Sequence, residues 1–546
     1  MSPGLLAHAE QVAQEFDFDP DNVSRAAHHF LAQMRQALGH NSAIQIPSYV
    51  TKVPTGHEKG VFLAVDLGGT NCRVCWVQFH GDSTYTVVET KHIVPRELRV
   101  NPSHKPLFRF IAEKIRDFLQ KHAELGDTKC DEGVTLPTDL NGESYWKLGF
   151  TFSFTFEQDS LAHGSMIQWD KGWDIPDALG RDPCAMLQTA IDELTLPVRV
   201  AALTNDSVGT LMTRSYTSGS PTLVGAIFGT GTNAAYAERL SNVTKLHDRE
   251  AFSSPGRDDL MVLNTEWGGL DSEKEVLPTT RYDDMLDLES TNPKSQLLEK
   301  RVSGLYLGEL LRLVILQLLE ANLFDMVLDE DSPVTTPESI DSSFLSHVAG
   351  DRSQSLEKAV LHIAQALRAR DVSAGDARAI RVISMAIARR GARLAGAALA
   401  AIILQSGRLE VEHPPPKSRV VAYQEHELKS PTSESGSFGF FSKPLSHLRR
   451  LIRGLLRRLG LDRLSCLNPP PHAPLVADTA VPGEDVIDIG VDGSLIEFYP
   501  GFEEDIRGAL REVPEIGVEG ERRVRIGPAK NGSSVGAALV AQSASL

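Results

Sequence analysis

Hydrophobic residues along this chain follow two spacings, which predict helices in some segments and strands in others. Apolar residues recur every three or four positions, as on one face of a helix, in segments 5–38, 107–122, 186–194, 297–319 and 380–405. Short apolar runs typical of buried strands occupy residues 61–65, 148–154, 198–203, 223–228 and 486–492. Because strands and helices alternate, we expect an α/β fold.

Two of the apolar runs belong to hairpins of the same design. Residues 61–65 lead into the glycine-containing turn 66–71, after which a second strand follows. Residues 223–228 lead into a similar turn, 229–233, which is also followed by a strand. Because one device occurs twice, far apart in the chain, the sequence predicts an α/β fold with duplicated halves.

Residues 408–484 differ in composition from the rest of the chain. They contain two Pro-Pro-Pro runs and a serine-rich centre, which predicts a flexible surface insertion. Within it, segment 447–464 has leucines on one helical face with arginines around them, as in helices that bind an anionic membrane or a partner groove. The alternative is a surface helix without a partner, or a segment absent from the working protein.

Length and charge narrow the class of protein. With 546 residues, the chain is long enough for two domains or two lobes. Its 55 basic and 72 acidic residues leave a net charge of −17, which argues against a nucleic-acid-binding protein with a basic face.

The sequence further predicts a cytoplasmic protein. Its first residues lack the basic and apolar regions of a secretory signal, and the longest apolar run, 394–404, is shorter than the roughly 20 residues that span a bilayer. Five cysteines, an odd number in a long chain, favour a reducing compartment. Cys72 and Cys75 form a Cys-x-x-Cys without a second pair, so we interpret them as strand-packing residues rather than a zinc or redox site.

Both glycine turns have the chemistry of a phosphate site. In the first, Gly68 and Gly69 let the backbone approach a ligand, and successive N–H groups in such a turn form an anion-binding nest. Asp66 would repel phosphate unless a cation lay between them, which indicates a metal–nucleotide complex. One such turn also fits an ordinary hairpin. Two of them, the second at 229–233, favour a nucleotide whose phosphates are held from both sides.

A carboxylate and a polar segment are candidates for the reaction itself. Asp206 follows strand 198–203, and strand ends are where α/β proteins bind ligands, so Asp206 is a candidate proton acceptor for an attacking hydroxyl. The alternative is an aspartate that caps the next helix. Ser153 and segment 168–174 combine polar groups with indoles, as a polyhydroxylated ligand requires, although a structural loop has the same composition.

Eight motifs together carry a resemblance to a known family. In chain order they are LAVDLGGTNCRV, LGFTFSF, WDKGWDI, TNDSVGTL, GAIFGTGTNAAYAE, NTEWGG, NPKSQLLEKRVSGLYLGE and IGVDGSLIEFYPGF. Their order and spacing resemble those of the eukaryotic hexokinases, most of all the fungal glucokinases, from about residue 8 to residue 541 apart from the insertion. The resemblance implies two ribonuclease H-like lobes of the actin-like kinase superfamily with a central cleft. It also implies transfer of the γ-phosphoryl group of ATP to the 6-hydroxyl of glucose.

The resemblance implies roles for individual residues, and Asp206 matches the catalytic base. The residues that match sugar contacts are Ser153, Phe154, Asp170, Lys171, Asn205, Asn233, Glu266, Gln296 and Glu299. The residues that match nucleotide contacts are Asp66, Gly68, Gly69, Thr70, Asn71, Arg73, Gly229, Thr230, Gly231, Thr232, Gly532, Ser533, Ser534 and Gly536. No residue is expected to bind Mg²⁺ directly. ATP would hold the ion, with a contact from Asp66 through water left open.

Several positions depart from the pattern of the family. Asp170 stands in place of threonine and Thr155 in place of proline, which puts the sugar affinity in question. Asn531 and Ser534 alter a DGSG motif, which puts the nucleotide affinity in question. Lys294 stands where glycine is usual, on the loop that carries the last two predicted sugar contacts.

We therefore expect a small-lobe domain at residues 1–206 and a large-lobe domain at residues 207–541, with the insertion inside the second. The expected activity is ATP-dependent phosphorylation of glucose, with other hexoses as further acceptors, as the first step of glycolysis. The alternative is a hexokinase-like sugar-sensing protein with weak or no turnover. The altered positions 170, 531 and 534 favour this alternative, and the intact Asp206 opposes it.

Overall fold

The computed structural model describes residues 3–122, 138, 142, 144–169, 172–256, 258–409 and 486–544. Asp170 and Lys171 lie outside these ranges, as do segment 447–464 and all but the first two residues of the predicted insertion 408–484. In the described part of the chain, no helix is both long enough and apolar enough to cross a membrane.

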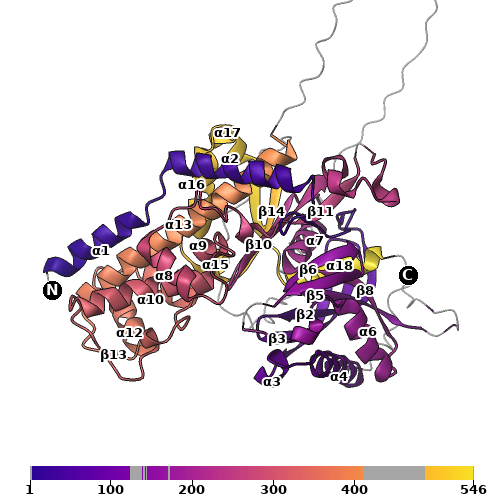
Figure 1. The fold of residues 1–546 in the computed structure, drawn as a ribbon, viewed down its shortest axis with the longest axis horizontal. Coiled ribbons are helices and arrows are strands. Elements are labelled where there is room, and N and C mark those ends of the chain that lie inside the picture. The colour runs from indigo at the N-terminus through magenta and orange to yellow at the C-terminus, as the bar shows by residue number, and fades with distance from the viewer. Residues whose placement is uncertain are drawn as a thin grey trace, which may run out of the picture. The chain divides into compact units, whose positions relative to one another are not determined.

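The first sheet has the first glycine hairpin at its centre. Its strands lie in the order β4-β3-β2-β5-β8. Figure 1 labels β2, β3, β5 and β8. Their bounds are β2 (Lys59–Gly68), β3 (Asn71–His80), β4 (Tyr85–Ile93), β5 (Trp146–Phe152) and β8 (Val198–Thr204). β2, β3 and β4 are antiparallel, whereas β5 and β8 extend the sheet in parallel with β2. The predicted strands and hairpin of this half are confirmed.

The second sheet repeats the arrangement of the first. Its strands lie in the order β1-β11-β10-β9-β14-β15. Their bounds are β1 (Ile46–Pro47), β9 (Val224–Phe228), β10 (Thr232–Arg239), β11 (Leu260–Asn264), β14 (Ile487–Asp492) and β15 (Val524–Pro528). β9, β10 and β11 are antiparallel, and β14 and β15 follow in parallel with β9, as β5 and β8 follow β2. The predicted α/β fold with duplicated halves is therefore confirmed, with β1 as an added edge strand.

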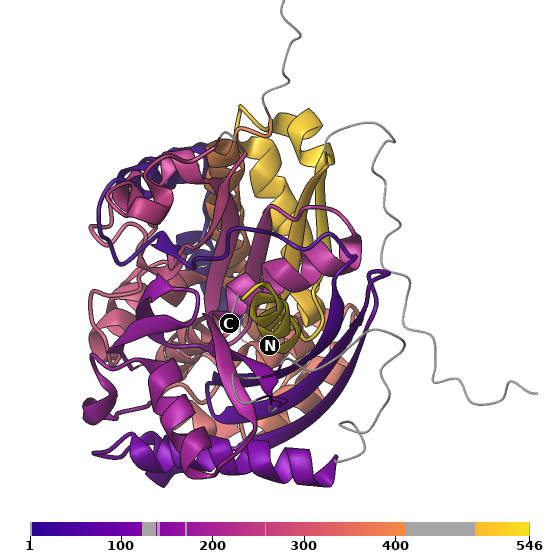
Figure 2. The ribbon, with the colours of Figure 1, turned by 90° about the vertical axis from the view of Figure 1, so that its right-hand side faces the viewer.

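Two helices between the sheets each pack on the sheet of the other half. α7 (Asp206–Ser218) follows β8 of the first sheet but packs on β9 and β14 of the second. α18 (Gly532–Ser543) follows β15 of the second sheet but packs on β2 and β5 of the first (Figure 2). The helices meet at two glycines, since a Cβ on Gly536 would lie 2.2 Å from Gly209 Cα. This contact links the two halves of the fold.

Helices cover the outer faces of both sheets. α4 (Lys105–Lys121) and α6 (Pro183–Glu193) pack on the first sheet and confirm the two helices predicted there. Further helices are α3 (Arg96–Arg99), α8 (Arg281–Glu289), α11 (Ser342–Gly350), α12 (Glu357–Ala366), α15 (Ser494–Phe498), α16 (Phe502–Glu512) and α17 (Gly517–Arg522). The short strands are β6 (Thr155–Ser160), β7 (His163–Gln168), β12 (Val327–Leu328) and β13 (Ala369–Arg370).

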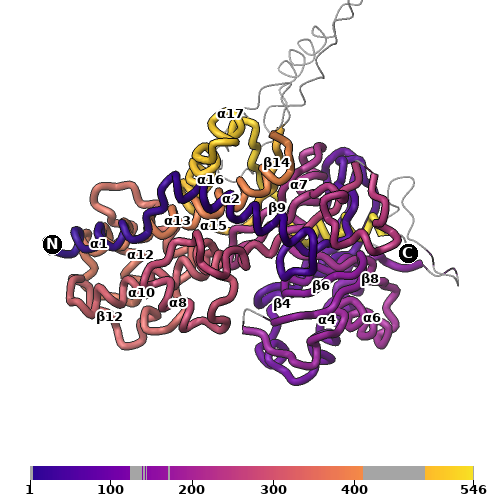
Figure 3. The backbone as a smooth tube through the Cα atoms, turned by 45° about the horizontal axis from the view of Figure 1, so that its top comes forward, coloured from indigo at the N-terminus to yellow at the C-terminus, as the bar shows by residue number. Residues whose placement is uncertain are grey.

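The N-terminal helices pack against the core of the second sheet, although they precede the first. The helical segment predicted at 5–38 forms α1 (Pro3–Glu15) and α2 (Pro20–Ala37). The interruption falls where the side chain of Asp19 caps α2. Both helices run along α13 (Ala374–Ser406), the long helix predicted at 380–405 (Figure 3).

The prediction of a helix at 297–319 is wrong in one respect, because the structure forms two helices there. α9 (Glu299–Val302) is followed by Ser303, whose backbone is extended, and α10 (Gly304–Glu320) begins directly after Ser303. The first N–H of α10 donates to Gly229 O at 2.8 Å instead of continuing α9. A tertiary hydrogen bond to the second glycine turn therefore breaks a segment whose local pattern is helical throughout.

Candidate active site

The first glycine turn joins β2 to β3 and lies against Ser153. Asp66 is buried on β2, and Arg73 on β3 donates to its Oδ2 from Nη1 at 2.9 Å. Gly69 has a φ of +50°, which glycine adopts without the strain that a side chain would cause. A Cβ on Gly68 would lie 3.3 Å from Ser153 Oγ. The first sheet therefore brings a candidate phosphate turn and a candidate sugar contact side by side.

The second glycine turn, at residues 229–232, is held by α10 and by Glu299. Gly229 O and Thr230 O accept hydrogen bonds from the first two N–H groups of α10 at 2.8 and 3.2 Å. Glu299 Oε1 accepts from Thr232 N at 3.2 Å, and a Cβ on Gly231 would lie 2.9 Å from the same oxygen. A second candidate phosphate turn thus lies beside a second candidate sugar contact.

Asp206 is the first residue of α7, directly after the helix cap. Asn205 is the N-cap, and its Oδ1 accepts from Ser207 N at 2.8 Å and from Ser207 Oγ at 2.7 Å. Asp206 Oδ1 also accepts from Ser207 N at 2.8 Å. The capping position therefore belongs to Asn205, and Asp206 lies where the helix dipole favours a negative charge.

Asp66, Asp206 and Asp492 form a carboxylate cluster. Burial raises the pKa of Asp66 to about 6 despite the opposing effect of Arg73, and the charges of Asp206 and Asp492 add to the rise. Burial also raises the pKa of Asp492, again with a contribution from Asp206. Because neighbouring negative charges disfavour one another, a cation brought close by a ligand would offset them, although these carboxylates do not have the arrangement of a metal site.

Asp492 and its neighbours are absent from the predicted site residues. Gly493 has a φ of +115°, and a Cβ on it would lie 2.7 Å from Gly229 N, so only glycine fits against the second turn. Ser494 Oγ lies 3.5 Å from Ser342 Oγ at the start of α11. A usable signal exists in the sequence, because the Asp-Gly at the end of β14 resembles the Asp-Leu-Gly that ends β2.

Several predicted sugar contacts gather in a hydrogen-bonded group at the edge of β10 and β11. Asn233 Nδ2 donates to Asn264 Oδ1 at 2.8 Å and to Glu266 Oε1 at 3.3 Å. Asn264 Nδ2 donates to the same glutamate oxygen at 2.8 Å. A Cβ on Gly268 would lie 2.2 Å from Gln296 Oε1 and 3.0 Å from Glu299 Cβ. Asn233 and Glu266 are therefore hydrogen-bonded to each other and to Asn264, which lies in the motif NTEWGG but is not among the predicted sugar contacts. Gln296 and Glu299 lie beside Gly268 of the same motif.

Phe154 belongs to a buried aromatic cluster beneath the predicted sugar segment. Its ring packs edge to face on Trp169 and Trp173, with centroid distances of 4.7 and 5.0 Å. The two indoles stack on each other at 5.5 Å. Phe154 thus packs against the two indoles of the segment and supports it. Thr155, the next residue, begins strand β6.

The predicted nucleotide residues at the start of α18 fall into two groups. Gly532 faces the carboxylate cluster, since a Cβ on it would lie 3.4 Å from Asp492 Oδ2, and Ser533 O accepts from Thr151 Oγ1 at 2.9 Å. Ser534 is buried, and Gly536 forms the contact with α7.

Two of the departures from the family pattern occupy left-handed backbone positions. Asn531 has a φ of +55°, a conformation that asparagine tolerates better than most residues. Lys294 has a φ of +65°, which explains why glycine suits this position. Its N–H donates to both carboxylate oxygens of Asp287, at 3.0 and 3.2 Å.

Cys72 and Cys75 are buried and free of a disulfide, which confirms their interpretation as strand-packing residues. Burial raises the pKa of the Cys75 thiol to about 12, so its reactive thiolate form is disfavoured. Within the described ranges, no group of three or more histidine, cysteine or acidic side chains has the arrangement of a metal site.

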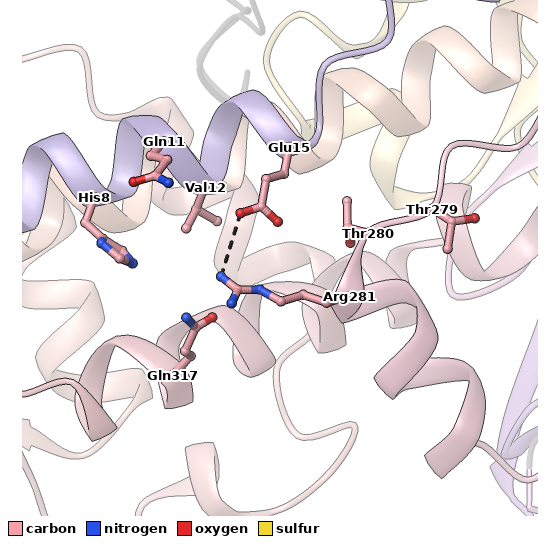
Figure 4. Close-up of a pocket in the computed structure, with 8 residues that line it drawn as sticks. All are labelled: His8, Gln11, Val12, Glu15, Thr279, Thr280, Arg281 and Gln317. Atoms are coloured by element: carbon pink, nitrogen blue, oxygen red, sulfur yellow. Dashed lines mark ion pairs between the residues drawn. The ribbon is translucent and has the colours of Figure 1, made fainter.

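A separate pocket of about 520 Å³ lies between α1, α8 and α10 (Figure 4). Its lining residues are His8, Gln11, Val12, Glu15, Thr279, Thr280, Arg281 and Gln317. Glu15 and Arg281 form an ion pair across it, with 3.7 Å between Oε1 and Nη2. None of the predicted site residues lines this pocket, so it is distinct from the candidate active site.

Comparison with known proteins identifies a family. Two family models, both described as hexokinase, match residues 8–216 and residues 223–427 with 464–543. The part left unmatched between the last two ranges lies inside the predicted insertion 408–484.

Similar proteins extend over the whole chain. A glucokinase of Aspergillus niger is 39% identical over 561 aligned residues, covering 100% of this chain and 98% of its own. Glucokinase-1 of Saccharomyces cerevisiae is 34% identical, with 98% and 97% covered. The structure titled hexokinase from Schistosoma mansoni complexed with glucose has a TM-score of 0.72 and 28% identity, with both chains fully covered. With its duplicated sheets and its motifs in family order, the chain belongs to the hexokinase family.

Proposed function

We propose that this chain transfers the γ-phosphoryl group of ATP to the 6-hydroxyl of glucose, with other hexoses as further acceptors. The observation that carries the proposal is the position of Asp206, which contributes to the raised pKa of both Asp66 and Asp492. Asp66 lies at the first glycine turn, and Asp492 precedes the glycine that packs on the second. The candidate base therefore interacts electrostatically with one carboxylate near each of two turns suited to phosphate, which supports the proposal.

The proposed chemistry relies on positioning and on charge. Backbone N–H groups of the two turns bind the phosphates, while Asp206 accepts the proton of the attacking hydroxyl. Asp66 is the candidate group to face Mg²⁺ carried by ATP, because burial and the charges of Asp206 and Asp492 raise its pKa and a nearby cation would offset them. When bound, the ion neutralises phosphate charge.

The sugar would be oriented by hydrogen bonds from both halves of the fold. Asn205 uses its Oδ1 as the helix cap, so we propose its amide nitrogen as a donor to the sugar. Glu266 and Glu299 are proposed acceptors for sugar hydroxyls, and Asn233 positions Glu266 through the contact at 3.3 Å. Ser153 supplies a hydroxyl from the first half. Closure around the sugar would exclude water, which otherwise competes as the acceptor.

The first test is Asp206→Asn in a coupled assay of ATP- and glucose-dependent product formation. We expect kcat to fall by about 10²–10⁴-fold, because the amide cannot accept the proton, while glucose binding measured by calorimetry is retained. Asp182→Asn is the matched control, since Asp182 caps α6 and asparagine caps a helix equally well. Turnover within tenfold of the parent would exclude Asp206 as the base.

The same assay addresses the sugar-sensing alternative. The described residues support the enzyme, because the candidate base interacts electrostatically with Asp66 at the first glycine turn and with Asp492 beside the second. A parent protein that binds glucose but forms no product would instead establish the alternative.

A further inference from the structure

In the first half of the fold, a side-chain hydrogen bond joins the predicted sugar segment to the first glycine turn. Trp173 belongs to the predicted sugar segment, and its Nε1 donates to the carbonyl oxygen of Gly69 in the first glycine turn, at 2.5 Å. The indole ring is buried. A residue on the sugar side therefore holds the backbone of the turn that is proposed to bind phosphate.

The position of this carbonyl matters because a peptide unit is planar and trans. The Gly69 carbonyl and the Thr70 N–H belong to the same peptide unit and point in opposite directions. Fixing the carbonyl on Trp173 consequently fixes the direction of the Thr70 N–H, one of the donors available to a phosphate. The Thr70 carbonyl is fixed separately, by Val94 N at 2.9 Å.

The far side of the same segment is anchored to the end of α3. Asn101 N donates to Asp174 O at 3.0 Å, and Asp174 N donates to Arg99 O at 2.9 Å. Trp173 thus lies directly before a residue that is held by two backbone hydrogen bonds, and its own indole is bonded to the glycine turn. Displacement of the segment would be passed to the turn through this indole.

Trp169 provides an internal comparison. Its ring stacks on Trp173 with an angle of 11° between the planes, and both rings contact Phe154. Its Nε1, however, donates to Ile175 O at 2.9 Å, directly after the sugar segment. The two indoles have similar packing, but only Trp173 reaches the glycine turn.

We propose that Trp173 is a positioning residue that couples sugar binding to nucleotide binding. A sugar that fixes the segment around Trp173 orients the Thr70 N–H and so strengthens nucleotide binding. By linkage, the nucleotide strengthens sugar binding by the same factor. This inference rests on the proposed function, since it presumes a sugar on one side of Trp173 and a phosphate on the other.

The test compares Trp173→Phe with Trp169→Phe by calorimetry. The titrants are glucose and a non-hydrolysable ATP analogue with Mg²⁺, each measured with and without the other. In Trp173→Phe the ring packing is retained and the donor is lost. We expect nucleotide affinity in the presence of glucose, and the coupling factor with it, to fall by about threefold to tenfold. Glucose affinity without nucleotide should change by less than about twofold.

Trp169→Phe should keep the coupling factor, because the hydrogen bond that this variant loses, from Trp169 to Ile175, does not reach the glycine turn. A coupling factor unchanged in Trp173→Phe, equally reduced in both variants, or absent from the parent would overturn the proposal. If Trp173→Phe does not fold, β-(3-benzothienyl)alanine at position 173 keeps the shape of the indole without its N–H. Failure of the proposed function appears differently, as a parent protein without product formation.

Discussion

The buried carboxyl group of Asp66 makes the ligand-free protein less stable at neutral pH. Its pKa is raised from 3.8 to about 6, so the folded state holds this proton more tightly than the unfolded state. The stability that the protonated group contributes is complete below about pH 4 and is lost as the pH rises through 6. A shift of this size corresponds to about 3 kcal/mol at pH 7. The buried charge of Asp66 therefore lowers the free energy of unfolding at neutral pH unless a cation offsets it.

We expect Asp66→Asn to raise the free energy of unfolding of the ligand-free protein at pH 7, by up to about 3 kcal/mol, because it removes the buried charge. The gain should shrink as the pH approaches 4, where the parent carboxyl is protonated in both states. Urea denaturation at pH 4 and pH 7 measures this difference, with Asp19→Asn as the control, since Asp19 is the exposed cap of α2. A gain of equal size at both pH values would contradict the raised pKa.

Residues of the site differ in how far the sequence could identify them. Asp206, Glu266 and Gly69 lie in short motifs whose local pattern is visible in the sequence. Asn264 contacts Asn233, 31 residues away, only because β10 and β11 are neighbouring strands, although its bond to Glu266 is local. The role of Asp492 likewise depends on a strand order that local spacing does not specify.

At the scale of elements, the contact between α7 and α18 requires glycine. Gly536 lies so close to Gly209 that a Cβ would meet backbone atoms at 2.2 Å, and backbone cannot move aside as a side chain can. The crossing of these helices joins both sheets to one core, which includes Phe79, Leu211 and Ala538. A change at the crossing should therefore affect the whole fold.

We expect Gly536→Ala to lower the free energy of unfolding by about 1–3 kcal/mol, because overpacking forces the two helices apart. Gly508→Ala is the matched control in α16, where the nearest atom to a new Cβ is the end of a flexible arginine, at 3.9 Å. The free energy of unfolding of that control should rise by about 0.5–1 kcal/mol, since alanine is a better helix former than glycine. Chemical denaturation of both variants measures the contrast, and an unchanged stability in Gly536→Ala would show that the helices separate without cost.

Element types could be predicted from the sequence, whereas their partners could not. The spacing of apolar residues identified both hairpins and the long helix α13. The same spacing gives no sign that α7 packs on the second sheet and α18 on the first. It also misses the break between α9 and α10, because a hydrogen bond from a distant glycine turn causes it. The predicted boundary between the two domains, at residue 206, stays a prediction.

For the whole molecule, the distribution of sugar contacts predicts closure by glucose alone. Ser153 lies at the turn of the first sheet, whereas Glu266 and Glu299 belong with the turn of the second. A sugar that binds all three gains its full interaction energy only when the two halves approach each other. Nucleotide is not required for these contacts.

We therefore expect saturating glucose, without nucleotide, to lower the radius of gyration measured by small-angle X-ray scattering and to change tryptophan fluorescence. Glu266→Ala should weaken glucose binding by at least tenfold, because it leaves the amides of Asn233 and Asn264 without their shared acceptor. At glucose concentrations that saturate the parent, this variant should show a smaller change in both signals. The control is an acyclic polyol at equal concentration, which matches the solvent effect but not the ring geometry. Identical scattering with and without glucose, in a parent protein shown by calorimetry to bind it, would mean that the contacts of one half suffice and that closure belongs to a later step.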